Sequence, residues 1–291
     1  MRNLARVIED TVGILYVKAL KELPPDVSKA IAHAARREKN TIAKKILKVI
    51  RENIRIAEER GLFICQDTGI PVCIVGVGKD FPLSLSEIER SLRRGVAAVT
   101  RSYPIRPNIL DTVTRKRTFS NVGARVPVIY YEPLDKKKII TLSFIPKGSG
   151  SENMSFLRMF TPAQGLTAVK RFIIECVAQA GANPCPPVIV GVGLGGTADE
   201  CMRLAKKAAV RDLSRKNPNR RIAGLESELL RCVNKLGIGP MGLGGSTTAL
   251  AVNIEKADTH ISLNPVAINM QCWAARRSAA SIDNSGMVRY G

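Results

Sequence analysis

Three cysteines stand at borders between loops and predicted strands, where a side chain can face a site. Cys65 begins the segment Cys65–Gly69, which adds an amide, a carboxylate and a glycine turn. Cys185 lies among prolines in Asn183–Pro187, and Cys272 follows a predicted strand. Each cysteine alone is more often a core residue than a ligand. Together they suggest an iron–sulfur centre, because cysteine thiolates are the usual ligands of such clusters.

The seven cysteines do not follow a disulfide or zinc-ribbon pattern. Their number is odd, the chain is long, and no two are spaced as Cys-x-x-Cys. We therefore expect most of them to be reduced and buried.

Two glycine-rich segments resemble phosphate-binding loops only in part. Gly191, Gly193 and Gly196 follow a predicted strand with dinucleotide-fingerprint spacing, but residues 216–219 lack the acidic residue that the fingerprint requires. We therefore disfavour a nucleotide-dependent oxidoreductase and expect a helix N-terminus that holds an anion or packs tightly. The segment 239–247 lacks the lysine of a phosphate loop, so we favour a flexible backbone that lines a site over a plain connection.

The two histidines carry weak signals on spacing alone. His33 lies on an amphipathic helical segment, which favours a structural or surface position. His260 follows a predicted strand beside Asp258 and Thr259. An isolated histidine of this kind is more often a satisfied polar residue than a catalyst.

Charge is the most unusual bulk property. Among 291 residues, 45 Lys and Arg exceed 25 Asp and Glu, which gives a net charge of +20. Such a balance fits nucleic acid, an acidic partner or an anionic substrate. Only 4% of residues are aromatic, which argues against stacking on bases, and the positive charges are spread along the chain. We therefore expect mostly solvated basic surface and disfavour a nucleic-acid partner, and a basic nucleic-acid-binding protein stays open as the alternative from a different functional class.

The hydrophobic pattern predicts an α/β fold with mixed sheets and packed helices. Helical spacing dominates the first sixty residues, and further helices are expected from Ser84 to Val99, over 167–180, after Thr197 and along 225–236. Strands are expected within 62–78, 126–131, 139–144, 188–192, 249–254 and 265–270. Ser84 with Glu87, and Thr197 with Glu200, fit the capping box. We expect one α/β domain over 1–291, with a helical N-terminal part at about 1–60.

Nothing in the sequence indicates a membrane or secreted protein. Hydrophobic residues are 45% of the chain, yet no apolar run approaches the roughly 18 residues that span a bilayer. The first fifteen residues include charges at Arg2, Arg6, Glu9 and Asp10, unlike a signal peptide. We expect a soluble, cytoplasmic protein.

Seven motifs in their order resemble the α subunit of two-subunit class I fumarate hydratases, with the L-tartrate dehydratase α subunit a close relative. The motifs are CQDTG at Cys65, RPN at Arg106, KGSGSEN at Lys147, NPCPP around Cys185, GVGLGGTADE at Gly191, LGIGPMGLGG at Leu236, and TH at Thr259 followed by QCWAARR. The resemblance covers nearly the whole chain, from the PPDV segment at Pro24 to Arg277. The GGTADE and SENMS segments look more like fumarase than tartrate dehydratase α chains.

The resemblance implies a [4Fe–4S] cluster and a set of site residues. Cys65, Cys185 and Cys272 match its three ligands, which leaves Cys73, Cys176, Cys201 and Cys232 as packing residues. The fourth iron has no protein ligand and serves as a Lewis acid. Asp67 is implied as the acid/base group, and His260, despite its weak spacing signal, as a second catalytic residue that contacts the substrate. The implied substrate-binding residues are Gln66, Arg106, Lys147 and Gly148.

The implied reaction is reversible hydration of fumarate to (S)-malate, a step of the tricarboxylic acid cycle. Single-chain members have a C-terminal domain that supplies further substrate-binding residues, and this chain stops before such a domain. We therefore expect a separate β subunit and an α2β2 heterotetramer, with some of the +20 charge facing an acidic partner. If the partner is also basic, the excess would instead attract dicarboxylates.

Overall fold

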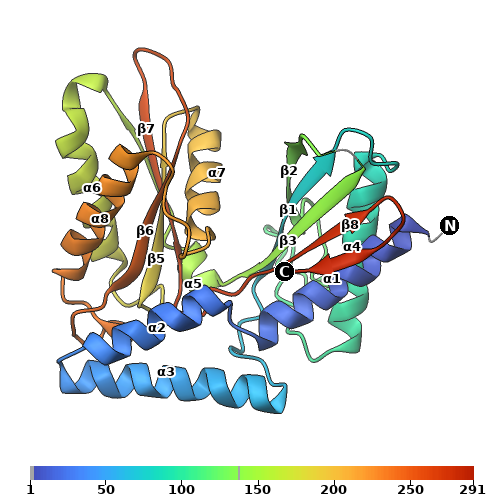
Figure 1. Cartoon of the computed structure of the whole chain (residues 1–291), viewed down its shortest axis with the longest axis horizontal. Helices are drawn as coiled ribbons and strands as arrows, with labels where there is room; N and C mark the ends of the chain where they lie inside the picture. Colours follow the sequence, from blue (N-terminus) through green and yellow to red (C-terminus); the bar gives the residue numbers. More distant parts are fainter. Residues whose placement is uncertain (1–2, 137) are drawn as a thin grey trace. The chain divides into compact units, whose positions relative to one another are not determined.

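The computed structural model describes residues 3–136 and 138–291, and they form two compact units (Figure 1). Unit 1 is built from the described residues of Met1–Pro24, Ile56–Gly148 and Arg276–Gly291. Unit 2 is built from Pro25–Arg55 and Ser149–Ala275. Each unit has its own sheet and its own hydrophobic core. The expectation of one domain over 1–291 stays a prediction.

Unit 1 is a five-stranded mixed sheet with order β2-β1-β3-β8-β9, packed against two helices. Strand β1 pairs with β2 in parallel, whereas β1–β3, β3–β8 and β8–β9 are antiparallel. The elements are α1 (Leu4–Lys21), β1 (Ile70–Gly78), α4 (Leu85–Ser102), β2 (Val128–Leu134), β3 (Ile139–Lys147), β8 (Ser278–Asp283) and β9 (Val288–Tyr290).

The two helices of unit 1 follow from local sequence signals. Helix α4 begins with the predicted capping box, in which Ser84 and Glu87 bond each other's backbone N–H, so that prediction is confirmed. Gly95 on α4 lets the helix approach α1 closely, because a Cβ there would lie 2.3 Å from the Glu9 carbonyl oxygen. Apolar residues of both helices, including Tyr16, pack on β1, β3 and β8.

Unit 2 is a four-stranded mixed sheet with order β4-β7-β5-β6 and helices on both faces (Figure 1). Strands β5 and β6 are parallel, and β7 is antiparallel to β4 and β5. Helices α6 and α8 cover one face and α7 the other. The elements are α2 (Pro25–Arg37), α5 (Ser149–Glu152), β4 (Phe156–Phe160), α6 (Gly165–Ala180), β5 (Val188–Leu194), α7 (Ala198–Ala209), α8 (Arg220–Asn234), β6 (Ala249–Lys256) and β7 (Asn264–Gln271), with short 3-10 turns at Pro162–Gln164 and Pro240–Gly242. Helix α3 (Thr41–Arg60) starts in unit 2 and ends in unit 1.

The glycines of the partial dinucleotide fingerprint serve packing. A Cβ on Gly191 would lie 2.1 Å from the Ala205 carbonyl oxygen, and one on Gly193 would lie 2.0 Å from the Cys201 carbonyl oxygen. Both glycines therefore let α7 lie directly on β5. The tight-packing alternative is confirmed by these contacts.

The second predicted capping box is wrong. Thr197 does precede α7, but its hydroxyl donates to the Asp199 carboxylate at 2.6 Å and makes no side-chain cap bond. Glu200 instead forms an ion pair with Arg203. Asp199 and Arg203 thus bind the Thr197 hydroxyl and the Glu200 carboxylate that the capping box would have used.

The predicted α/β class with mixed sheets is confirmed, and so is the helical character of the first sixty residues within the described part of the chain. The strand expected within 62–78 starts only at Ile70, after the turn at Gly69. Strands β4, β8 and β9 were not predicted. None of the helices among the described residues combines the length and apolar character that crossing a membrane requires.

Candidate active site

The Cys65–Gly69 segment of unit 1 is a tight turn leading into β1. One carboxylate oxygen of Asp67, Oδ1, accepts the backbone N–H of Gly69 at 2.9 Å. Gly69 has φ +76°, and a Cβ there would lie 2.5 Å from the Pro146 carbonyl carbon and 2.8 Å from the Lys147 nitrogen. Only glycine fits this position. The turn is therefore pressed against the end of β3, where Ile70 pairs with Lys147.

Buried residues hold the backbone of this turn. The Tyr16 hydroxyl donates to the Thr68 carbonyl at 3.1 Å, and the Arg276 Nη2 donates to the Asp67 carbonyl at 2.7 Å. Tyr16 is fully buried and Arg276 is 2% exposed. Two consecutive carbonyls of the turn thus have partners from α1 and from the start of the C-terminal segment.

Thr68 connects the turn to the segment that carries Arg106. Its hydroxyl donates to the Arg106 carbonyl at 3.0 Å. The Asn108 amide donates to the Thr68 hydroxyl at 3.1 Å and to the Gly69 carbonyl at 3.3 Å. Buried Asn121 donates to the same Arg106 carbonyl at 3.0 Å. The backbone of Arg106 is fixed next to the turn while its side chain remains exposed.

Unit 1 therefore brings together six of the nine residues predicted for the site. They differ in exposure: Gln66 and Arg106 are exposed, Cys65 and Asp67 half-buried, and Lys147 only 1% exposed. A buried lysine is rare unless it is paired or functional. The six are Cys65, Gln66, Asp67, Arg106, Lys147 and Gly148.

Unit 2 brings Cys185 and Cys272 to the same end of its sheet. Cys185 precedes β5 and Cys272 follows β7, which is antiparallel to β5. The Trp273 N–H donates to the Cys185 carbonyl at 3.1 Å. Cys185 has φ +55°, a left-handed conformation uncommon for a residue with a side chain. Both half-buried cysteines therefore belong to one loop cluster.

The glycine-rich loop 239–247 joins this cluster. The Met241 N–H donates to the Pro186 carbonyl at 2.8 Å. At Gly239 the chain lies so close to Gly244 that a Cβ would sit 1.8 Å from the Gly244 carbonyl oxygen. The loop is therefore a compact turn beside Cys185, and its site-lining role stays a prediction.

His260 lies at the other end of the unit 2 sheet. It belongs to the loop between β6 and β7, whereas Cys272 follows the far end of β7. An eight-residue strand spans about 25 Å. The exposed His260 ring bonds the Ser262 hydroxyl at 2.8 Å, and its neighbour Thr259 donates to the Gly196 carbonyl at 3.0 Å. Within unit 2, His260 and the two cysteines are not brought together.

The seven cysteines fall into two chemical groups. Burial raises the pKa of Cys73 to about 12, of Cys176 to about 12 and of Cys201 to about 11. Such thiols do not readily give the thiolates that bind metals. The half-buried thiols are Cys65, Cys185, Cys232 and Cys272. The three cysteines predicted as ligands therefore belong to the accessible group, and their chemistry fits an iron–sulfur cluster.

Within the described residues, no three His, Cys, Asp or Glu side chains gather into a metal-binding group. Cys65 belongs to unit 1, whereas Cys185 and Cys272 belong to unit 2. The shared ligation of one cluster by all three cysteines stays a prediction.

Comparison with known proteins decides the family. The sequence matches the fumarate hydratase (Fumerase) family over residues 9–281. The chain belongs to this family. It is therefore a hydro-lyase.

Relatives in the fumarate hydratase family carry two kinds of name. The chain is 44% identical to the "Putative L(+)-tartrate dehydratase subunit alpha" of Methanocaldococcus jannaschii, over 94% of this chain and 97% of that protein. It is 31% identical to the "L(+)-tartrate dehydratase subunit alpha" of Escherichia coli K12, over 88% and 84%. It is 32% identical to the "Putative fumarate hydratase class I" of Geobacillus stearothermophilus, over 94% of this chain but 55% of that protein.

The sequence analysis did not identify four residues whose side chains hold the turn and the Arg106 segment, namely Tyr16, Asn108, Asn121 and Arg276. Asn108 and Arg276 stand inside motifs quoted for the family, RPN and QCWAARR, which is a signal that could have been used. Tyr16 and Asn121 carry no local signal, since their contacts reach back to Thr68 and Arg106.

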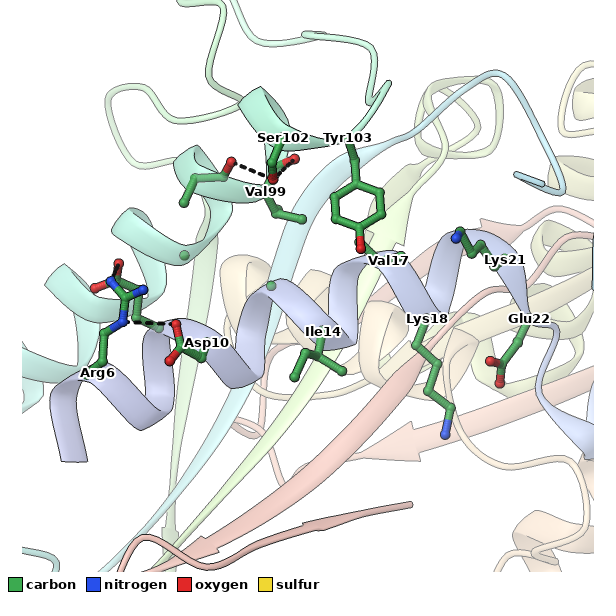
Figure 2. A pocket seen from close by; sticks show the side chains of 14 residues that line it. Arg6, Asp10, Ile14, Val17, Lys18, Lys21, Glu22, Val99, Ser102 and Tyr103 are labelled. Atoms are coloured by element: carbon green, nitrogen blue, oxygen red, sulfur yellow. Dashed lines mark hydrogen bonds and ion pairs between the residues drawn. The ribbon is translucent and has the colours of Figure 1, made fainter. Parts of the chain in front are cut away.

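Unit 1 also has a groove away from these residues. The groove has a volume of about 570 Å³ and lies between α1 and α4. Figure 2 shows Ile14 and Val17 on α1, and Val99 and Tyr103 on α4 and directly after it. Charged side chains of both signs border it, including the Arg6–Asp10 ion pair at 3.0 Å. None of the predicted site residues lines this groove.

Proposed function

We propose that this chain is the α subunit of a [4Fe–4S] hydro-lyase that reversibly hydrates fumarate to (S)-malate in the cytoplasm. The observation that carries the proposal is the hydrogen bond from Thr68 to the Arg106 carbonyl, 3.0 Å long. It fixes the segment bearing Cys65 and Asp67 beside the segment bearing Arg106. A thiol, a carboxylate and a guanidinium thereby come from neighbouring, well-anchored turns.

Arg106 suits the recognition of a dicarboxylate. Its backbone is held by two side chains, and its exposed guanidinium can donate two parallel hydrogen bonds to one carboxylate. Exposed Gln66 can add an amide donor, and Gly148 a backbone contact. The buried Lys147 adds positive charge next to the turn. These groups would bind and orient the substrate.

Asp67 suits the proton transfer that hydration requires. The Gly69 N–H holds Oδ1, so the orientation of the carboxylate is fixed before substrate arrives. When malate is dehydrated, Asp67 would take the proton from C3; when fumarate is hydrated, Asp67 would return that proton to C3. General acid–base groups of this kind contribute about 10²–10⁴-fold to rate.

The three accessible cysteines Cys65, Cys185 and Cys272 would hold the cluster. When bound, a [4Fe–4S] cluster with one open iron supplies a Lewis acid for the substrate's oxygen atoms. The positive side chains of this chain would stabilise the negative charge that develops on the carboxylate next to C3.

A second subunit would complete the site. Two of the relatives are named as alpha subunits, and this chain covers only 55% of the relative named as a class I fumarate hydratase. We therefore propose a separate β subunit in an α2β2 assembly. We include His260 as a substrate contact on the resemblance alone. Within unit 2, it lies at the other end of the sheet from Cys185 and Cys272.

L-tartrate dehydration to oxaloacetate is a second candidate reaction. The names of two relatives favour it, whereas the GGTADE and SENMS segments favour fumarate. Malate and tartrate are both hydroxydicarboxylates, and both lose water across the two carbons that bear the carboxylates. The two therefore share the site and differ in the substituent at one carbon.

Iron and acid-labile sulfide analysis after anaerobic reconstitution tests the cluster. The chain, co-produced with its β subunit, should hold about four irons and four sulfides. Cys185→Ala should lose them, while Cys232→Ala, also a half-buried cysteine, should keep them. Equal loading of both variants would refute the ligand assignment.

Turnover by the reconstituted pair tests the substrate. We expect a higher kcat/KM for malate and fumarate than for L-tartrate, measured on one preparation with known iron content. A higher kcat/KM for tartrate would replace fumarate hydration by the second candidate. Absence of turnover on all three substrates would refute the proposed function.

A further inference from the structure

Arg276 is a buried cation that holds the Cys65–Gly69 turn but has no role yet in the proposed reaction. It follows Cys272 by four residues and is 2% exposed. Its Nη2 donates to the Asp67 carbonyl at 2.7 Å, a bond between residues 209 positions apart in the chain. The guanidinium thus reaches from the C-terminal part of unit 1 into the turn that carries the proposed acid/base group.

Structural stability alone is a poor reason for this residue. Within the part of the chain that the structure describes, its Nε and Nη1 are buried without a hydrogen-bond partner. Burying a charge with most of its donors unsatisfied is unfavourable, and an apolar residue of similar volume often serves a core as well or better. A charged side chain in this position is better explained by a function at the neighbouring turn, which carries Asp67.

Tyr16 acts on the next carbonyl of the same turn. Its hydroxyl donates to the Thr68 carbonyl at 3.1 Å, and its ring packs on Phe144 with centroids 4.5 Å apart. Burial raises the pKa of Tyr16 above its usual range, against the opposing charge of Arg276, so the phenol stays protonated and donates. Two rigid donors hold two consecutive peptide groups.

We propose that Arg276 is a positioning residue for Asp67. It fixes the Asp67 peptide, while the Gly69 N–H fixes the Asp67 carboxylate, so that backbone and side chain are both held. The proposal rests on the proposed function, because it assigns Arg276 to the reaction in which Asp67 moves a proton. Misplacement of a reacting group by about 1 Å can cost about 10²-fold in rate.

Three variants in the holoenzyme test this role. Arg276→Gln removes the charge and shortens the side chain, and Arg276→Lys keeps the charge and one donor for the Asp67 carbonyl. Arg93→Gln is the matched control, because Arg93 of α4 also donates to backbone carbonyls, at 3.1 Å to Val126 and 3.0 Å to Gly123. That control removes a guanidinium–carbonyl contact of unit 1 outside the turn.

The expected signature is a kcat effect without a KM effect. For malate, Arg276→Gln should lower kcat at least tenfold with KM within twofold, and Arg276→Lys should recover part of the loss. Arg93→Gln should keep both constants within twofold. If Arg276→Gln keeps kcat within twofold at full iron content, the proposal is overturned. If that variant does not fold, Arg276→Lys carries the test, and an unchanged kcat for it overturns the proposal.

Amide hydrogen exchange provides a readout that does not depend on activity. In the chain with its β subunit, Arg276→Gln should speed exchange in peptides covering Cys65–Gly69, and Arg93→Gln should not. Equal exchange in wild type and Arg276→Gln would overturn the positioning role. A wild type that turns over neither malate, fumarate nor tartrate would instead refute the proposed function, whatever the exchange result.

Discussion

At the scale of single residues, Gly69 decides whether the turn before β1 can close. Gly69→Ala must place a Cβ within 2.5 Å of the Pro146 carbonyl carbon at φ +76°. We expect a loss of at least about 2 kcal/mol in the free energy of unfolding, from backbone strain plus a contact with a rigid backbone. Urea denaturation of the purified chain measures it.

Gly224 offers the control for this prediction. It lies within α8, is exposed, and has no atom within 4 Å of an added Cβ. Gly224→Ala should therefore raise stability by about 0.4–1 kcal/mol, since alanine restricts the unfolded chain. If Gly69→Ala and Gly224→Ala lose stability equally, the contact with the Pro146 backbone does not exclude a side chain from the turn.

Thiol reactivity gives a second prediction at the residue scale. A rise in pKa from 9.0 to about 12, as at Cys73, lowers the thiolate fraction at pH 8 about 10³-fold. Iodoacetamide should therefore modify the half-buried cysteines well before Cys73, Cys176 and Cys201, as followed by peptide mass spectrometry.

Cluster loading should change this pattern selectively. After anaerobic reconstitution, Cys65, Cys185 and Cys272 should become protected while Cys232 keeps its rate. Protection of Cys232 together with the other three would indicate general burial and count against the ligand assignment.

At the scale of elements, Glu38 ties the turn between α2 and α3 to the glycine-rich loop. Its carboxylate accepts the Ser246 N–H and hydroxyl, both at 2.9 Å, and the Asn40 N–H at 3.0 Å. Burial raises its pKa, but these donors outweigh burial and hold the pKa below its ordinary value of 4.5. The ionised form is therefore favoured by folding.

The sign of the pH effect follows from this depressed pKa. Glu38 contributes stability above pH 4.5, and the contribution is lost as pH falls through its folded-state pKa. Glu38→Gln should cost about 1–3 kcal/mol at pH 7, and the difference from wild type should shrink in acid. Urea titrations at pH 7 and pH 3.5 measure both. Glu52→Gln, which removes an exposed ion pair with Arg55, should show a much smaller change at pH 7.

Local patterns predicted the elements better than the connections between them. Helices α1–α4 and α6–α8 have clear apolar periodicity, whereas β4 reads Phe-Leu-Arg-Met-Phe without polar alternation, and it was not predicted. Strands β8 and β9 have pairing partners that no local pattern specifies. The Cys65–Gly69 motif was recognisable, but its bonds to Tyr16 and Arg276 join distant segments. Packing, rather than composition, determines those bonds.

At the scale of the whole molecule, the net charge of +20 has two possible consequences. If basic surface faces an acidic β subunit, salt should weaken the assembly, because exposed charges are screened beyond about 10 Å at 0.1 M ionic strength. If the charge instead attracts dicarboxylates, salt should lower kcat/KM and leave the assembly intact. Two relatives are named as alpha subunits, which predicts a partner for this chain. We therefore expect salt to weaken the assembly more than it lowers kcat/KM.

Titration of the holoenzyme from 50 to 500 mM KCl separates these effects. Analytical ultracentrifugation should show dissociation of the α and β subunits at high salt, at protein concentrations where they are associated at low salt. Malate kcat/KM measured at saturating β subunit should fall by a smaller factor than the association constant. A stable assembly whose kcat/KM falls steeply would reverse this ranking and assign the excess charge to substrate attraction. An assembly and a kcat/KM that both resist salt would show that the charge is solvated surface, because neither partner nor substrate would then depend on it.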